Sequence, residues 1–114
     1  MILLYDGTFE GFLSLVYEVY YKKLKPTKIY KTLPNEILFE EILEINSSKE
    51  SGIKVLNAIK TKFPKEILEK ILNIFMCDSK EFEMALLEYI VIGFKDSKQL
   101  YNINNSCVFY LNYL

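Results

Sequence analysis

The fold is decided by residues 2–24, which read ILLYDGTFEGFLSLVYEVYYKKL. The apolar start is typical of a short buried strand, and Asp6-Gly7 marks the turn that ends it. Thr8 then precedes apolar residues at helical spacing, so we expect it to cap a helix that continues until Pro26 stops it. The expected apolar face of this helix consists of Phe9, Phe12, Leu13, Val16, Tyr20 and Leu24.

Two more short stretches after this helix have the character of strands. Residues 28–32 and 41–45 are rich in β-branched side chains and are bounded by polar or proline residues. Residues 33–39 are expected to connect them as a loop.

The rest of the chain has helical periodicity. Residues 47–50 have the pattern of a capping box, and Pro64 occupies a helix-start position. A second capping box at residues 78–81 opens a helix that we expect to end near Gly93, and a weaker last helix begins at about Asn105. The expected apolar faces are Ile53, Leu56, Ile59 and Phe63, then Ile67, Leu68, Ile71, Leu72 and Phe75, then Phe82, Ala85, Leu86, Tyr89 and Ile90.

These elements predict an α+β fold that is mostly helical, with a small sheet of about three strands covered by four to five helices. The chain of 114 residues is 51% hydrophobic, which suffices for a core without disulfides or metals. No repeat, linker or low-complexity tract divides residues 1–114, so we expect a single domain.

The residue types that are absent exclude several chemistries. The chain has 14 lysines and 15 acidic residues, but no arginine, histidine or tryptophan. Without histidine there is no imidazole base and no Ser-His or Cys-His nucleophile pair. Cys77 and Cys107 lack the companions that a zinc site needs. We therefore expect no catalytic residues, no metal and no cofactor, and do not expect an enzyme.

The cysteine usage and the apolar pattern also indicate a location. Two cysteines far apart in a lysine-rich chain fit a reducing compartment better than a disulfide scaffold. The N-terminus lacks the positive region of a signal peptide, and no apolar run approaches the ~20 residues that span a bilayer. The sequence therefore predicts a cytoplasmic protein without a membrane segment.

The turn between the first strand and the first helix is a candidate contact site. Helix N-termini bind anions, and glycines let a ligand approach the backbone. In the structural interpretation, the same residues form the turn, cap the helix and allow close packing, while the two acids repel a phosphate. The structural interpretation is the stronger on physical grounds alone. The residues concerned are Asp6, Gly7, Thr8, Phe9, Glu10 and Gly11.

A basic stretch at residues 20–32 is the second candidate site. It holds five lysines, three tyrosines and no acid, so lysines are available for phosphates and tyrosines for unpaired bases. Alternatively, it is a solvated helix end and an edge strand protected by lysines. Residues 33–50 carry five Glu against one Lys and offset part of this charge. The candidate contacts are Tyr20, Tyr21, Lys22, Lys23, Lys25, Lys28, Tyr30 and Lys31.

The C-terminus lacks charge throughout residues 99–114. A terminal helix this apolar is expected to be buried in its own core or to cover a partner. We favour burial in its own core, with a partner or a homo-oligomer through the apolar C-terminus as the alternative.

Residues 5–13, the helix at 16–20 and Ile92-Gly93-Phe94-Lys95 resemble the bacterial "probable DNA metabolism protein" domain, a family of unknown function. Members open with Tyr-Asp-Gly-Ser/Thr-Phe-Glu-Gly and place Gly-Phe-Lys after a helical stretch. The resemblance therefore adds Gly93, Phe94 and Lys95 to the candidate contacts. It implies a radical-SAM DNA repair or modification protein as partner, and some members are fused to a uracil-DNA glycosylase-like domain.

The chain also departs from that family. Members continue past Gly-Phe-Lys into a segment that contains arginine and histidine, whereas this chain stops at Leu114. The resemblance thus implies a C-terminally shortened member. Our leading hypothesis is a non-catalytic accessory domain in bacterial DNA metabolism or repair that acts with a partner protein. The alternatives are a protein-interaction or self-associating module unrelated to DNA, and a weak single-stranded nucleic-acid binder through residues 20–32.

Overall fold

The computed structural model describes residues 1–35, 39–77 and 82–101. These residues contain three strands and four α-helices, which confirms the α+β class and the mostly helical content. The capping box expected at residues 78–81 and the helix expected from Asn105 lie outside the described residues. The chain packs as two compact units, residues 1–56 and 57–114. The prediction of a single domain stays a prediction, and each unit is described by itself.

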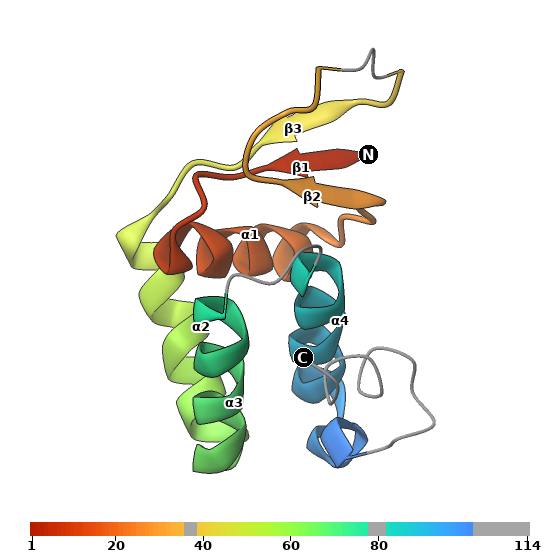
Figure 1. Ribbon diagram of the computed structural model, residues 1–114. Coiled ribbons are helices and arrows are strands. Elements are labelled where there is room, and N and C mark those ends of the chain that lie inside the picture. The colour runs from red at the N-terminus through yellow and green to blue at the C-terminus, as the bar shows by residue number, and fades with distance from the viewer. Residues whose placement is uncertain (36–38, 78–81, 102–114) are drawn as a thin grey trace. The chain divides into compact units, whose positions relative to one another are not determined.

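The first unit contains a parallel sheet of three short strands. The first strand lies between the other two, in the order β2-β1-β3, and both outer strands run parallel to it (Figure 1). Leu3 stands opposite Ile29 on one side and opposite Leu43 on the other. The predicted strands are therefore confirmed, each slightly shorter than expected. Their bounds are β1 (Ile2–Leu4), β2 (Lys28–Tyr30) and β3 (Ile42–Glu44).

Helix α1 (Phe9–Lys22) connects β1 to β2 and lies along the sheet (Figure 1). Leu3 of the central strand and Phe12, Leu15 and Val16 of α1 are completely buried, whereas Phe9 and Tyr20 of the predicted apolar face are only half-buried. The rings of Tyr5 and Phe12 meet edge to face, with centroids 6.0 Å apart. Burial of each large apolar side chain contributes about 1.5–3 kcal/mol, so this packing fixes α1 against the sheet.

The end of α1 differs from the prediction. The helix ends at Lys22 rather than continuing until Pro26, so placing Leu24 on its apolar face was wrong. Lys23 adopts a left-handed conformation (φ 52°), and its N–H donates to the Val19 carbonyl. The N–H of Leu24 donates to the same oxygen over 3.1 Å. A left-handed residue thus closes the helix before proline can act.

Helix α2 (Lys49–Lys62) begins one residue later than the predicted capping box implies. The cap is Ser48, whose hydroxyl oxygen accepts from the Ser51 N–H (3.2 Å). Ser47 instead donates its hydroxyl to the Glu10 carboxylate of α1 over 2.8 Å. The predicted box was wrong because this contact with α1 removes Ser47 from the cap.

The buried face of α2 also differs from the prediction. Val55 and Ile59 are buried, whereas Ile53 is 47% exposed. Gly52 lies against the first turns of α1, since a Cβ built on it would stand 3.4 Å from Glu10 Cγ. Close approach of the two backbones therefore selects the buried face of α2 near its start, and Ile53, the next residue on the helix, falls outside this face.

The second unit is helical in its described residues. Helix α3 (Lys65–Met76) follows Pro64, as predicted, and α4 (Phe82–Lys95) leads into a short 3-10 helix, η1 (Ser97–Tyr101). Helix α3 buries Ile67, Ile71 and Ile74, but Leu72 is exposed. The rings of Phe75 and Phe82 meet edge to face with centroids 5.6 Å apart. The most buried side chains of α4 are Phe82, Leu86, Leu87, Tyr89 and Ile90.

Helix α4 ends near Gly93, as predicted, but Gly93 itself is not the residue that ends it. Helix α4 continues through Gly93 to Lys95, and Gly93 is buried. A Cβ built on it would stand 2.6 Å from Phe63 Cζ and 2.8 Å from Leu100 Cδ2. Glycine is therefore present because two apolar side chains pack directly on its backbone, and not because the helix needs a left-handed cap.

Candidate nucleic-acid interface

The turn that joins β1 to α1 is closed by its own side chains. The Asp6 carboxylate accepts from the N–H of Thr8 (2.9 Å) and from the Thr8 hydroxyl (2.6 Å). The Thr8 oxygen in turn accepts from the Gly11 N–H over 2.9 Å and caps the helix as predicted. Gly7 has a φ of 84°, a conformation that other residues rarely adopt. The polar atoms of the turn therefore bond mainly to one another.

The remaining residues of the turn also have structural partners. A Cβ on Gly11 would collide with the Asp6 carboxylate and stand 3.1 Å from the Thr8 hydroxyl oxygen. Glu10 accepts from Ser47, and Phe9 is half-buried. The geometry favours the structural interpretation of Asp6–Gly11, and a ligand role for this turn stays a prediction.

Acid should weaken this turn. The hydrogen bonds from Thr8 lower the pKa of Asp6 below its ordinary value, so the folded state holds the ionised form more strongly than the unfolded state does. The resulting stabilisation is present above the unfolded pKa of about 3.9 and disappears as the pH falls through the lower folded value. In urea titrations, the unfolding free energy of the wild type should fall more steeply with acid than that of Asp6→Asn. Superimposable slopes for these two proteins would contradict this account, and Glu88→Gln serves as a control that should follow the wild type.

The second motif of the predicted site belongs to the second unit. Phe94 packs on Phe63 with ring centroids 5.3 Å apart, and the Lys62 ammonium stands 5.7 Å from the Phe94 ring centre. Gly93 is buried, and Lys95 is exposed at the helix end. Gly93 and Phe94 thus contribute to the core of this unit.

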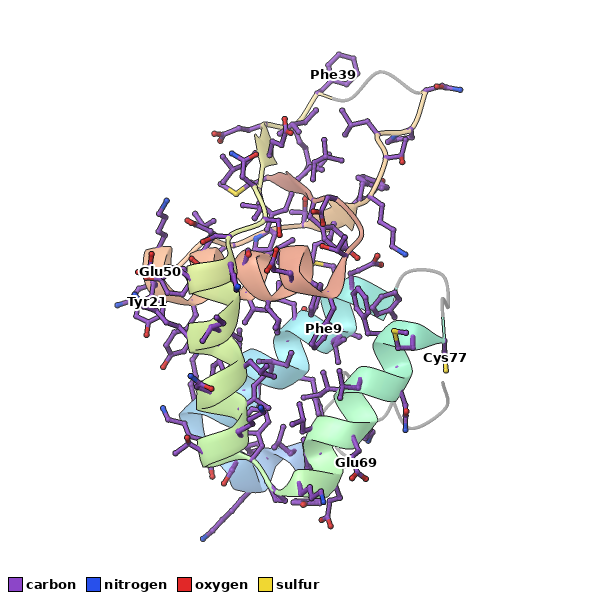
Figure 2. All side chains as sticks on the ribbon, turned by 90° about the vertical axis from the view of Figure 1, so that its left-hand side faces the viewer. Phe9, Tyr21, Phe39, Glu50, Glu69 and Cys77 are labelled. Carbon is purple, nitrogen blue, oxygen red and sulfur yellow. The ribbon has the colours of Figure 1, made fainter. Side chains whose placement is uncertain are left out.

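Three tyrosines gather at the C-terminal end of α1. The rings of Tyr17 and Tyr21 lie with centroids 4.5 Å apart, and Tyr20 meets Tyr21 edge to face at 5.6 Å. Tyr21, at the C-terminal end of the helix, is 65% exposed (Figure 2). The predicted site did not include Tyr17, although its spacing of four residues from Tyr21 is the signal for contact on a helix.

Lysines continue this aromatic cluster toward β2. Lys23, Lys25 and Lys28 are exposed, and no acidic residue occurs between residues 19 and 35. We call the whole region the tyrosine–lysine surface; it consists of Tyr17, Tyr20, Tyr21, Lys22, Lys23, Lys25 and Lys28.

Two acids stand beside this surface and reduce its charge. The Lys22 ammonium lies 2.6 Å from the Glu18 carboxylate. Lys54 stands 5.8 Å from the Tyr17 ring centre and 3.4 Å from Glu50. Exposed ion pairs of this kind contribute at most about 1 kcal/mol, so a phosphate can compete for both lysines.

Tyr30 and Lys31 do not share the tyrosine–lysine surface, although they belong to the same predicted stretch. Tyr30 ends β2 and is half-buried. The aliphatic part of Lys31 lies over the Asp6–Gly11 turn, with its Cδ 3.4 Å from a Cβ built on Gly7. Strand β2 carries the chain from one end of the sheet to the other, and this separates Lys31 from Lys25 and Lys28.

The fold and this surface define a small α+β protein with an exposed aromatic and basic region. Comparisons with protein-family models, with curated protein sequences and with solved structures find no match. In the described residues, no group of three or more Cys, Asp or Glu side chains could hold a metal ion. None of the helices in the described part of the chain is long and apolar enough to cross a membrane.

Proposed function

We propose that this chain is a non-catalytic accessory domain of bacterial DNA metabolism that holds a single nucleic-acid strand on its tyrosine–lysine surface. It acts in the cytoplasm and with a partner protein. The observation that carries the proposal is the exposed ring of Tyr21, packed on Tyr17 and Tyr20 and continued by lysines in an acid-free segment. Stacking platforms next to cations are what single-strand binders use.

The chemistry of the side chains specifies which nucleic acid suits this surface. An unpaired base can stack on the outer face of Tyr21, whereas the bases of a duplex are already stacked on each other. Lysines attract phosphates as point charges and cannot make the bidentate base contacts of arginine. The surface should therefore prefer single strands to duplexes and discriminate little between sequences.

The direct test is a titration of a fluorescein-labelled oligothymidine, followed by anisotropy at several salt concentrations. We expect a Kd of about 10⁻⁴–10⁻⁶ M. The slope of log K against the logarithm of the salt concentration should be about −2, as follows from three lysine–phosphate contacts on a single strand. A duplex of the same length should bind less tightly. Absence of binding at low salt, or affinity that does not respond to salt, would refute the proposal.

Tyr21→Ala should weaken binding of the oligothymidine by roughly 5- to 150-fold, because stacking on an aromatic side chain contributes about 1–3 kcal/mol per base. The salt slope should not change, since no charge is removed. Tyr21→Phe should retain the wild-type affinity, as should Tyr101→Ala, which removes another exposed tyrosine. Equal affinities of Tyr21→Ala and Tyr21→Phe would rule out stacking at this position.

The resemblance of residues 5–13 to the DNA-metabolism family supports a radical-SAM protein as the partner. Affinity purification of the tagged chain from its native cells, with identification of bound proteins by mass spectrometry, tests this part separately. Recovery of a radical-SAM protein supports it. Its consistent absence, with the tagged chain itself recovered, counts against that partner and leaves the single-strand test independent.

A further inference from the structure

Among the described residues, each outer strand of the sheet has one edge on which no other strand pairs. Strand β1 pairs with β2 on one side and with β3 on the other, and no further strand pairs with either outer strand within residues 1–35, 39–77 and 82–101 (Figure 1). An edge strand presents backbone N–H and carbonyl groups that another strand can use. Ile42 is exposed on β3, and Phe39 just before it is 95% exposed.

The two edges carry opposite charge. Exposed lysines accompany β2, whereas exposed glutamates accompany β3. The lysines are Lys25, Lys28 and Lys31, and the glutamates are Glu41 and Glu44. The Glu40 carboxylate instead accepts from the Thr27 hydroxyl next to β2. Charged side chains on an edge normally prevent pairing, because like charges then face each other across the two strands. That protection acts only between two copies of the same edge.

Unlike edges fit one another in the register that the sheet already uses. Strand β1 aligns Ile29 and Leu43 with the same residue, Leu3. If β2 of a second copy continues the sheet beyond β3 in this register, Ile29 stands beside Leu43. Lys28 then lies diagonally from Glu44 on one face, a separation that long side chains bridge. Pairing of β3 with β3 in parallel register would place Glu44 beside Glu44.

We propose that the acidic β3 edge of one copy pairs in parallel with the basic β2 edge of a second copy. Charge complementarity selects this pairing over both pairings of like edges, and Phe39 and Ile42 supply apolar surface beside the junction. The contact is heterologous, because each copy offers a different edge to its neighbour. Association is therefore expected to proceed beyond a dimer as the concentration rises.

Sedimentation equilibrium without nucleic acid tests this proposal independently of strand binding. The weight-average mass should rise with protein concentration at low salt. It should return to the monomer value in ~1 M salt, where the Debye length is about 3 Å and exposed charges are screened. A monomeric mass at every concentration and salt would overturn the proposal.

Exchange of two charges gives the sharper test. Lys28→Glu and Glu44→Lys should each be monomeric alone, because each places like charges at the junction. An equimolar mixture of the two variants should associate, as should the double variant Lys28→Glu/Glu44→Lys, because opposite charges face each other again in both. Association of either single variant at the wild-type level, or failure of both the mixture and the double variant, would refute this pairing. Circular dichroism should give the same spectrum for all four proteins.

Discussion

Reversal of three lysines on the tyrosine–lysine surface is expected to abolish binding of single-stranded oligonucleotides. The variant Lys23→Glu/Lys25→Glu/Lys28→Glu changes the charge of this surface by six and leaves the Lys22–Glu18 pair in place. Phosphate contacts supply much of the affinity of sequence-independent binding, which is weak at physiological salt, about 10⁻⁴–10⁻⁶ M. Loss of the contacts, with repulsion in their place, should therefore put the affinity below the range that anisotropy detects.

A matched variant separates this effect from overall charge. Lys49→Glu/Lys60→Glu/Lys65→Glu makes the same change in net charge with exposed lysines of α2 and α3. It should keep most of the wild-type affinity at moderate salt, because none of these three lysines belongs to the tyrosine–lysine surface. If both triple variants lose binding to the same extent, the interaction depends on net charge and not on this surface.

Gly93→Ala is expected to destabilise the protein by up to about 2 kcal/mol. The added methyl group would overlap Phe63 and Leu100, both buried, and overpacking of this kind costs about 1–3 kcal/mol. The preference of helices for alanine over glycine offsets about 1 kcal/mol of this packing cost. A loss of this size lowers the melting temperature by several degrees in a chain of about 100 residues. Urea denaturation followed by circular dichroism measures it directly.

The control for this prediction is another alanine substitution on the same helix. Glu88 is exposed on α4, so Glu88→Ala should change the unfolding free energy by no more than about 0.5 kcal/mol. A Gly93→Ala protein about 1 kcal/mol more stable than the wild type, the gain that helix propensity alone gives, would mean that Phe63 and Leu100 move aside without cost. The close packing that explains the glycine would then be refuted.

The sequence predicted the first strand, the turn and α1 well, because their signals are local. Asp6, Gly7 and Thr8 build the turn with bonds that span two or three residues. Apolar spacing then places Phe12 and Val16 in the core. Local signals of this kind do not depend on contacts with the rest of the chain, and the α+β class was predicted from them.

The errors arise where distant residues overrule a local rule. Ser47 matches a capping box, but its hydroxyl donates to the Glu10 carboxylate instead, and Ser48 caps the helix. Helix α4 does end near Gly93, but the glycine itself is explained by the packing of Phe63 and Leu100 and not by the helix end. Neither contact is visible in the residues next to Ser47 or Gly93.

The candidate surface was predicted in part for the same reason. The charge count along residues 20–32 assigns Lys31 and Lys25 to one site. In the structure, the direction of β2 separates them and places Lys31 over Gly7. Tyr17 lies outside the counted stretch, yet its ring packs on Tyr21. Three-dimensional neighbours therefore redefine the surface without changing its basic and aromatic character.

The most direct measurement of the central claim is a titration of the ¹⁵N-labelled protein with unlabelled oligothymidine, followed in amide correlation spectra. Shift changes should concentrate at the C-terminal end of α1 and in the residues up to Lys28, and Tyr21→Ala should diminish them. Changes confined to other residues, or no changes under conditions in which anisotropy reports binding, would contradict single-strand recognition by the tyrosine–lysine surface.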